Sequence, residues 1–408
     1  MTTDTPQLSR PGYRPGQHVT ALDGLRGAAV LAVVFYHCLY LPGDNAVVGF
    51  FNRLLLTGWV GVDLFFVLSG FLITGILLDT RKSGGGYFVP FYARRLFRIF
   101  PLYFLLLAIV FIGLPLVAPG VVPEDAQRSQ VWFWLHISNI YYALYYWSWG
   151  ALSPTWSLAI EEQFYLVWPA VVLLCPPRAL KWVCLGLAVM AFGLRVLGRW
   201  ADFGPVAIYV FTLTRIDGLA LGAWVAIMVR DGAMLKRWGG PLITLAAVVG
   251  AGMLAFVCFY DRIDNLGRGG QTIGYSAAAI AFAGLILAAS GATHANRLQS
   301  LCAAGWLRFF GKYSYAIYLF HRPVESFVNR VEARLGWETQ GTVPLALLHV
   351  GLVLGVTTLV SVVTWYTFES RILKLKRYFP YGAKPRRDAA AAGWESPTLQ
   401  PSTPGTTR

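Results

Sequence analysis

The sequence predicts an all-α, polytopic membrane protein with about ten transmembrane helices, and two observations carry this prediction. Of 408 residues, 56% are hydrophobic and only 13% are charged, which is far more apolar than a soluble domain of similar length. Apolar runs of roughly 18 or more residues recur along the chain, and each can cross a hydrocarbon core of about 30 Å as a helix. One continuous membrane domain over residues 20–370 therefore accounts for most of the chain.

Hydropathy places the predicted spans in order along the chain. We expect them near residues 20–41, 59–78, 98–118, 157–175, 180–198, 206–229, 241–260, 272–290, 312–330 and 344–366. Residues 131–149 are rich in Trp and Tyr, a composition that is as typical of a membrane-interface belt as of a span.

Loop charge decides whether residues 131–149 cross the membrane. If they do not cross, most basic residues collect on one face, as the positive-inside rule requires. If they do cross, the asymmetry largely disappears. We therefore expect both termini in the cytoplasm and residues 119–156 outside, as an aromatic-rich loop with an interfacial or re-entrant helix. The formal net charge of +14 is then explained by membrane insertion, and no nucleic-acid partner is expected.

The two ends of the chain and its cysteines provide no candidate catalytic or binding residues. Residues 1–19 are polar, and no cleavage site follows the first apolar stretch, so we expect a cytoplasmic segment and a retained helix. Residues 371–408 form a cytoplasmic tail that is basic at first. Beyond about residue 380 it is rich in Pro, Ala, Thr, Ser and Arg, which predicts disorder from there on. The five cysteines lack metal-ligand spacing and are assigned to packing. We expect no metal site and no tightly bound cofactor.

Arg26 and His37 are the first polar candidates, because a charge inside a span is costly and is usually retained for function. They are eleven residues apart, which is about three helical turns or about 16 Å along one helix face. A neutral imidazole near the outer side suits proton abstraction. His37 is therefore a candidate catalytic base, although a buried histidine can equally be a core hydrogen bonder.

Glu162 and Asp63 are the candidate partners of His37, since both are predicted near the outer ends of their helices. Either carboxylate could orient and stabilise the imidazole, as the third group of a catalytic triad does. Glu161 fits better as an acidic residue near a helix N-terminus. An internal pairing network is the alternative explanation for such residues. Further buried polarity lies at Arg215, Asp217, His321 and Arg322.

Arginines cluster near the cytoplasmic end of the third span. Arg95 and Arg98 are one helical turn apart, and guanidinium groups bind phosphate in a bidentate manner, so this pair could hold a phosphorylated cosubstrate. Anchoring of the topology by positive charge explains the same cluster, Arg94 included, equally well.

Several blocks in the chain resemble the type-three membrane acyltransferase family, whose members O-acylate sugars and other hydroxyl compounds. LDGLRGAAVLAVVFYH contains the Arg, ten residues, His signature at Arg26 and His37, and YARRLFRIFPLY contains Arg-x-x-Arg at Arg95 and Arg98. The blocks GVDLFFVLSGFLIT, PTWSLAIEEQFYLVWP and GKYSYAIYLFHRPV also match, in family order. The resemblance runs from about residue 20 to 370.

The resemblance implies a ten-helix domain in a bacterial inner or cytoplasmic membrane that transfers an acyl group, usually acetyl, from cytoplasmic acyl-CoA to an acceptor hydroxyl. It implies that His37 is the base, that Glu162 supports it, and that Arg26, Arg95 and Arg98 act on the CoA phosphates or along the transfer path. The acceptor class, whether glycan, glycolipid or metabolite, stays open. A transporter or flippase that uses the buried polar residues as a permeation path is the alternative.

Overall fold

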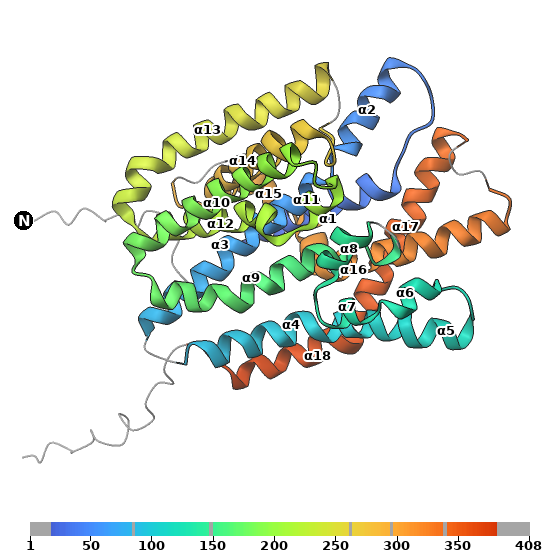
Figure 1. The fold of residues 1–408 in the computed structure, drawn as a ribbon, viewed down its shortest axis with the longest axis horizontal. Coiled ribbons are helices and arrows are strands. Elements are labelled where there is room, and N and C mark those ends of the chain that lie inside the picture. The colour runs from blue at the N-terminus through green and yellow to red at the C-terminus, as the bar shows by residue number, and fades with distance from the viewer. Residues whose placement is uncertain are drawn as a thin grey trace, which may run out of the picture.

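The computed structural model describes residues 18–83, 86–146, 150–260, 263–293, 297–337 and 341–381, and every regular element in these ranges is a helix. Within this part of the chain, nine helical segments are long and apolar enough to cross a membrane. Several of the long helices, among them α3, α4, α9 and α13, run in roughly similar directions (Figure 1). The chain is thus an all-α, multi-pass membrane protein, as the sequence predicts.

The long helices follow the predicted spans closely. They are α1 (Thr20–Cys38), α3 (Val60–Ser83), α4 (Phe88–Ala108), α9 (Thr155–Leu174), α10 (Pro177–Trp200), α12 (Thr212–Arg230), α13 (Gly232–Phe259), α14 (Tyr275–Ala289), α16 (Gly305–Arg334) and α17 (Val343–Thr364). Short or distorted turns extend several of them, namely η1 (Ile109–Gly113), α5 (Leu114–Val117), α11 (Pro205–Val210), η3 (Gly270–Gly274), η4 (Trp365–Glu369), α18 (Ser370–Leu373) and η5 (Lys374–Tyr378). The remaining helices are α2 (Ala46–Leu56), α6 (Glu124–Arg128), α7 (Val131–Trp134), α8 (Ser138–Tyr145), η2 (Gly150–Leu152) and α15 (Arg297–Cys302).

Helix α16 contains the predicted span 312–330 but is not among the nine apolar segments. It carries buried polar side chains along its length, including His321 and Glu325. These groups are tolerated because α16 packs against α1 and α17 instead of facing lipid on all sides.

Glycines bring the central helices into backbone contact. A Cβ on Gly27 of α1 would lie 2.0 Å from the Leu307 carbonyl oxygen of α16, and a Cβ on Gly311 would lie 1.9 Å from the Asp23 carbonyl oxygen. Small residues at such crossings permit close approach in membranes, where van der Waals packing replaces the hydrophobic effect. Further along, His37 of α1 meets His321 of α16. Because residue numbers rise along both helices from the contact at Gly27 and Leu307 to this contact, α1 and α16 run parallel.

Residues 119–156 do not form a further span. The described part contains only α6, α7, α8 and η2, all much shorter than the roughly 20 residues that a crossing needs. Helices α3 and α9 are parallel, since Ser69 bonds Glu161 and Thr74 bonds Trp168. Only one spanning helix, α4, lies between them in the chain, so a second crossing at 131–149 would have made them antiparallel.

Two predicted helix starts are wrong. Helix α4 begins at Phe88 and α13 at Gly232, each about ten residues before the predicted span, because charged residues at these ends, such as Arg94 and Arg237, weaken the apolar signal. The described chain continues to residue 381 and packs on α4. Arg94 donates hydrogen bonds to the carbonyl oxygens of Lys376 and Phe379, and α18 lies beside α4 (Figure 1). The predicted disordered part, 382–408, and residues 1–17 lie outside the described ranges.

Candidate functional site

His37 and His321 meet between α1 and α16. His37 Nδ1 lies 3.1 Å from His321 Nε2 and 3.0 Å from the Val33 carbonyl oxygen. His321 Nδ1 lies 2.7 Å from the Tyr318 carbonyl oxygen. His321 is fully buried, whereas His37 is partly exposed. The parallel packing of the two helices places both imidazoles at the same depth.

His37 lines a cavity of about 390 Å³ at the end of the bundle that carries residues 119–154. We call this the outer pocket, following the predicted orientation. Aromatic rings form much of its wall, and polar groups come from the two loops around residues 150–154 and 265–266. Its lining includes Tyr36, Trp59, Trp156, Tyr209, Tyr318, Ser153, Asn265 and Arg322.

The arginines of α1 and α4 line a second, inner pocket of about 120 Å³. Arg26 of α1 lines it together with Arg95 and Arg98 of α4. Glu161 is the acidic residue in its wall, and its two carboxylate oxygens accept hydrogen bonds from Ser69 at 2.8 Å and Tyr165 at 3.0 Å. The pocket is therefore strongly basic and is suited to an anionic group.

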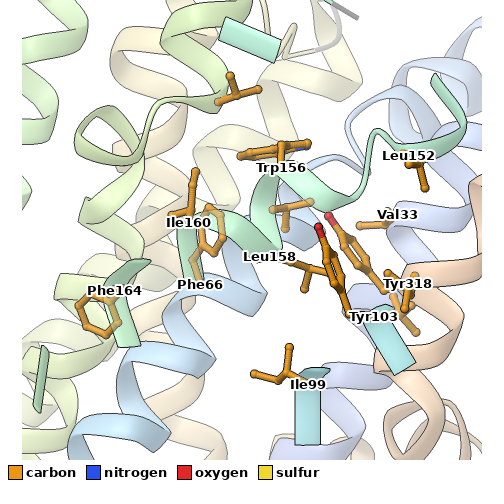
Figure 2. Packing of buried hydrophobic residues seen from close by; sticks show 14 of the residues in the cluster. Val33, Phe66, Ile99, Tyr103, Leu152, Trp156, Leu158, Ile160, Phe164 and Tyr318 are labelled. Atoms are coloured by element: carbon orange, nitrogen blue, oxygen red, sulfur yellow. The ribbon is translucent and has the colours of Figure 1, made fainter. Parts of the chain in front are cut away.

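The two pockets share a wall made by Val62 and Tyr318, which line both. The Tyr318 hydroxyl is hydrogen-bonded to the Ser157 hydroxyl at 2.5 Å. In Figure 2, Trp156 of the outer pocket lies above the Tyr318 ring, and Ile99 of the inner pocket lies below it. The structure thus places a basic pocket and a histidine pocket on opposite sides of one tyrosine.

Glu162 does not support His37, so this part of the sequence prediction is wrong. Its Oε1 is buried and has no hydrogen-bond partner among the described residues, and the charged groups that act on it are Glu161 and Arg95. Both hydrogen bonds of the His37 ring are made to Val33 and His321 instead. The similar predicted depth of Glu162 and His37 in the membrane therefore does not bring their side chains into contact.

Asp63 is also not a partner of His37. Its Oδ1 accepts a hydrogen bond from Arg215 Nη2 at 2.9 Å, and both side chains are buried. A second buried pair, Arg195 and Asp217 at 2.7 Å, lies on the adjoining helices. Arg215 further stacks on Tyr275, 3.9 Å from the ring centroid. The alternative of an internal pairing network is correct for these residues.

Two residues of the site matter more than the sequence predicts. Glu161 is predicted as a helix-terminal acid, yet it lies nearly two turns inside α9 and lines the pocket of the arginines. His321 is predicted only as further buried polarity, yet it contacts His37. One feature of the sequence points to His321. Polar side chains inside a membrane span are costly to bury, so each one in the span 312–330 is a candidate functional residue.

The outer loop contributes a buried histidine that lines neither pocket. His136 stacks on Tyr103 with ring centroids 4.0 Å apart and on Phe100 at 4.9 Å. Neither ring nitrogen has a hydrogen-bond partner among the described residues. Burial lowers the pKa of His136 to about 4, so the ring is neutral at physiological pH and acts as part of the aromatic packing.

The sequence is similar to a described protein family and to curated bacterial proteins. A family model described as an acyltransferase domain matches residues 19–366. The peptidoglycan O-acetyltransferase OatA of Listeria monocytogenes is 29% identical over 335 residues, which cover 77% of this chain and 50% of that protein. The O-acetyltransferase OatA of Staphylococcus aureus is 28% identical over 387 residues, which cover 90% of this chain and 58% of that protein.

The chain therefore spans about half the length of the curated relatives it matches. No solved structure matches it. Its helices and its bacterial relatives identify it as a multi-pass protein of a bacterial cell membrane.

Proposed function

Because the chain belongs to the acyltransferase 3 family, we propose that it transfers an acyl group, in the first place acetyl, from cytoplasmic acyl-CoA to a hydroxyl of a glycan on the outer side of the membrane. One observation carries the proposal. A pocket with three arginines and a pocket with a partly exposed histidine lie on either side of Tyr318.

The inner pocket supports a phosphorylated donor. Arg26, Arg95 and Arg98 supply planar cationic donors that match phosphate oxygens. Arg26 and His37 are about 16 Å apart along α1. A donor held by its phosphates at the arginines needs a flexible arm of about this length to present a thioester to His37, and acyl-CoA has such an arm.

The outer pocket supports a carbohydrate acceptor. Its aromatic rings offer flat apolar surfaces to the C–H faces of a sugar, and Ser153 and Asn265 offer hydrogen bonds to hydroxyl groups. The printed name of the Listeria relative gives peptidoglycan as the molecule it acetylates. A glycan is therefore the acceptor class that we propose for this chain.

The reaction follows from these positions. His37 accepts the proton of the acceptor hydroxyl, the oxygen attacks the thioester carbonyl, and the C–S bond breaks to release the CoA thiolate. The proton on His37 then returns to the thiolate. The products are an O-acyl ester and free CoA, so atoms and charge balance.

The test uses purified protein in liposomes with radiolabelled acetyl-CoA and a peptidoglycan fragment. We expect the His37→Ala variant to transfer label about 10²- to 10⁴-fold more slowly, which is the range for loss of a general base. His349→Ala is the control, because His349 is a buried histidine of α17 that pairs with Glu332 away from both pockets.

Equal transfer by the wild type and by His37→Ala would eliminate His37 as the base. Movement of the glycan across the bilayer without any label transfer would support a transporter instead.

A further inference from the structure

The hydrogen positions of the two histidines follow from their partners. A backbone carbonyl oxygen can only accept a hydrogen bond, so His321 Nδ1, at 2.7 Å from the Tyr318 carbonyl oxygen, must carry a hydrogen. In a neutral imidazole the other nitrogen is then an acceptor. His321 Nε2 therefore presents a lone pair.

The same reasoning applies to His37. Its Nδ1 faces two acceptors, the Val33 carbonyl oxygen at 3.0 Å and the His321 Nε2 lone pair at 3.1 Å. One hydrogen on His37 Nδ1 satisfies both contacts. His37 Nε2 is consequently the unprotonated nitrogen, and it makes no hydrogen bond to the described residues while His37 lines the outer pocket.

No carboxylate among the described residues is hydrogen-bonded to either ring. The charged and titratable groups that act on His37 are His321 and Arg322, both from α16. Arg322 is itself paired with Glu325. The place that an acidic residue takes beside the histidine of a catalytic triad is thus occupied by a second, neutral imidazole.

We propose that His321 is the positioning residue for His37: it holds the base in the tautomer whose Nε2 lone pair faces the outer pocket. This proposal rests on the proposed function and adds a second histidine to it. His321 does not line either pocket, so it acts through His37 and does not touch the acceptor.

The arrangement also serves the protonated state. When His37 Nε2 takes the hydroxyl proton, the ring becomes an imidazolium whose Nδ1–H donates to His321 Nε2, and a charged donor makes a stronger hydrogen bond than a neutral one. The His321 Nδ1–H remains bonded to the Tyr318 carbonyl oxygen. The buried positive charge is stabilised without a buried carboxylate, and the proton then leaves from Nε2.

The test compares two substitutions at one position. In His321→Gln, the side-chain amide oxygen reaches the place of Nε2 and accepts from His37 Nδ1, whereas His321→Leu leaves that hydrogen without its side-chain acceptor. We expect His321→Leu to lower kcat about 10- to 100-fold, the range for removal of a partner that orients a functional histidine, with KM for acetyl-CoA within about twofold of the wild type. We expect His321→Gln to recover most of the lost kcat.

The second readout does not depend on activity. Solid-state NMR of ¹⁵N-histidine-labelled protein in lipid bilayers distinguishes the two tautomers, and the His37 signals are identified by their loss in His37→Asn. We expect His37 to be protonated at Nδ1 in the wild type and in His321→Gln, and to be a mixture of tautomers in His321→Leu. His349→Gln is the matched control for loss of a buried imidazole.

A wild-type His37 protonated at Nε2, or an unchanged tautomer and kcat in His321→Leu, would overturn the role of His321. Absence of label transfer by the wild type together with the expected NMR signature would refute the proposed function alone, and the hydrogen-bonded histidine pair would stand.

Discussion

At the scale of single residues, the charges inside the helix bundle divide into two kinds. Asp63, Arg215, Arg195 and Asp217 are fully buried and paired with one another, whereas Arg26, Arg95 and Arg98 line an open pocket. A charge that is paired inside the membrane contributes to the fold. A charge that faces a cavity is available to a ligand.

The pair of Asp63 and Arg215 leads to a prediction about stability. Asp63→Asn leaves buried Arg215 without its hydrogen-bonded carboxylate, and breaking a buried ion pair in this way costs about 3–5 kcal/mol. We expect a clear loss of thermal stability in detergent and unchanged kcat per folded molecule. Asp125→Asn, in the exposed helix α6, is the control. A loss of kcat without a loss of stability would restore Asp63 as a catalytic candidate.

The inner pocket leads to a prediction about donor binding. Arg95→Ala removes a hydrogen-bond donor to phosphate that is worth about 1.5–3 kcal/mol, which corresponds to about 10- to 100-fold in affinity. We expect this weakening for acetyl-CoA by calorimetry. Arg94→Ala is the matched control, because Arg94 is adjacent in sequence but bonds the carbonyl oxygens of Lys376 and Phe379. Unchanged affinity in Arg95→Ala would contradict the assigned role.

At the scale of helices, the contact between α1 and α16 sets the geometry of both histidines. The two helices touch through Gly27 and Gly311 near the inner end and through His37 and His321 near the outer end. A substitution at either glycine therefore changes the crossing angle and spacing of the two helices, and with them the distance between His37 and His321.

We predict that Gly27→Ala disrupts catalysis from a distance. The added Cβ would lie 2.0 Å from the Leu307 carbonyl oxygen, so the helices must move apart, at a cost of about 1–3 kcal/mol. Label transfer and thermal stability should both fall. Gly355→Ala in α17, where no atom lies within 4 Å of the added Cβ, should change neither. Normal transfer by Gly27→Ala would show that the helix contact does not control the site.

At the scale of the whole molecule, the bundle contains an inner pocket lined by arginines and an outer pocket lined by His37, which share a wall at Val62 and Tyr318. The parallel pairs α1 with α16 and α3 with α9 confirm that residues 131–146 do not cross the membrane. They agree with the crossing pattern derived from loop charge. Which end faces the cytoplasm is still a prediction from that charge.

Thiol labelling in intact cells checks this orientation. In a background without the five native cysteines, Asp125→Cys should react with an impermeant maleimide added outside, and Lys236→Cys should react only after the membrane is permeabilised. Both positions are exposed, so a difference in labelling between the two variants reports the side of the membrane and not burial. The reverse pattern would invert the orientation and with it the proposed direction of acyl transfer.

The sequence by itself determined that the protein lies in a lipid bilayer. It also determined nearly all of the transmembrane helices and the helix face that Arg26 and His37 share. These properties depend on apolar length and on helical periodicity, which are local along the chain. The helix starts at Phe88 and Gly232 lie about ten residues before the predicted ones, because the charged residues in the first turns of α4 and α13 carry no apolar signal.

Only the tertiary structure decided which side chains meet between helices. Depth in the membrane can be estimated from residue number, but the rotation and lateral placement of each helix depend on packing with all its neighbours. For that reason Glu162 and Asp63, at similar predicted depth to His37, have other surroundings. The partner of His37 is a histidine 284 positions away, brought there by the close contact of α1 with α16.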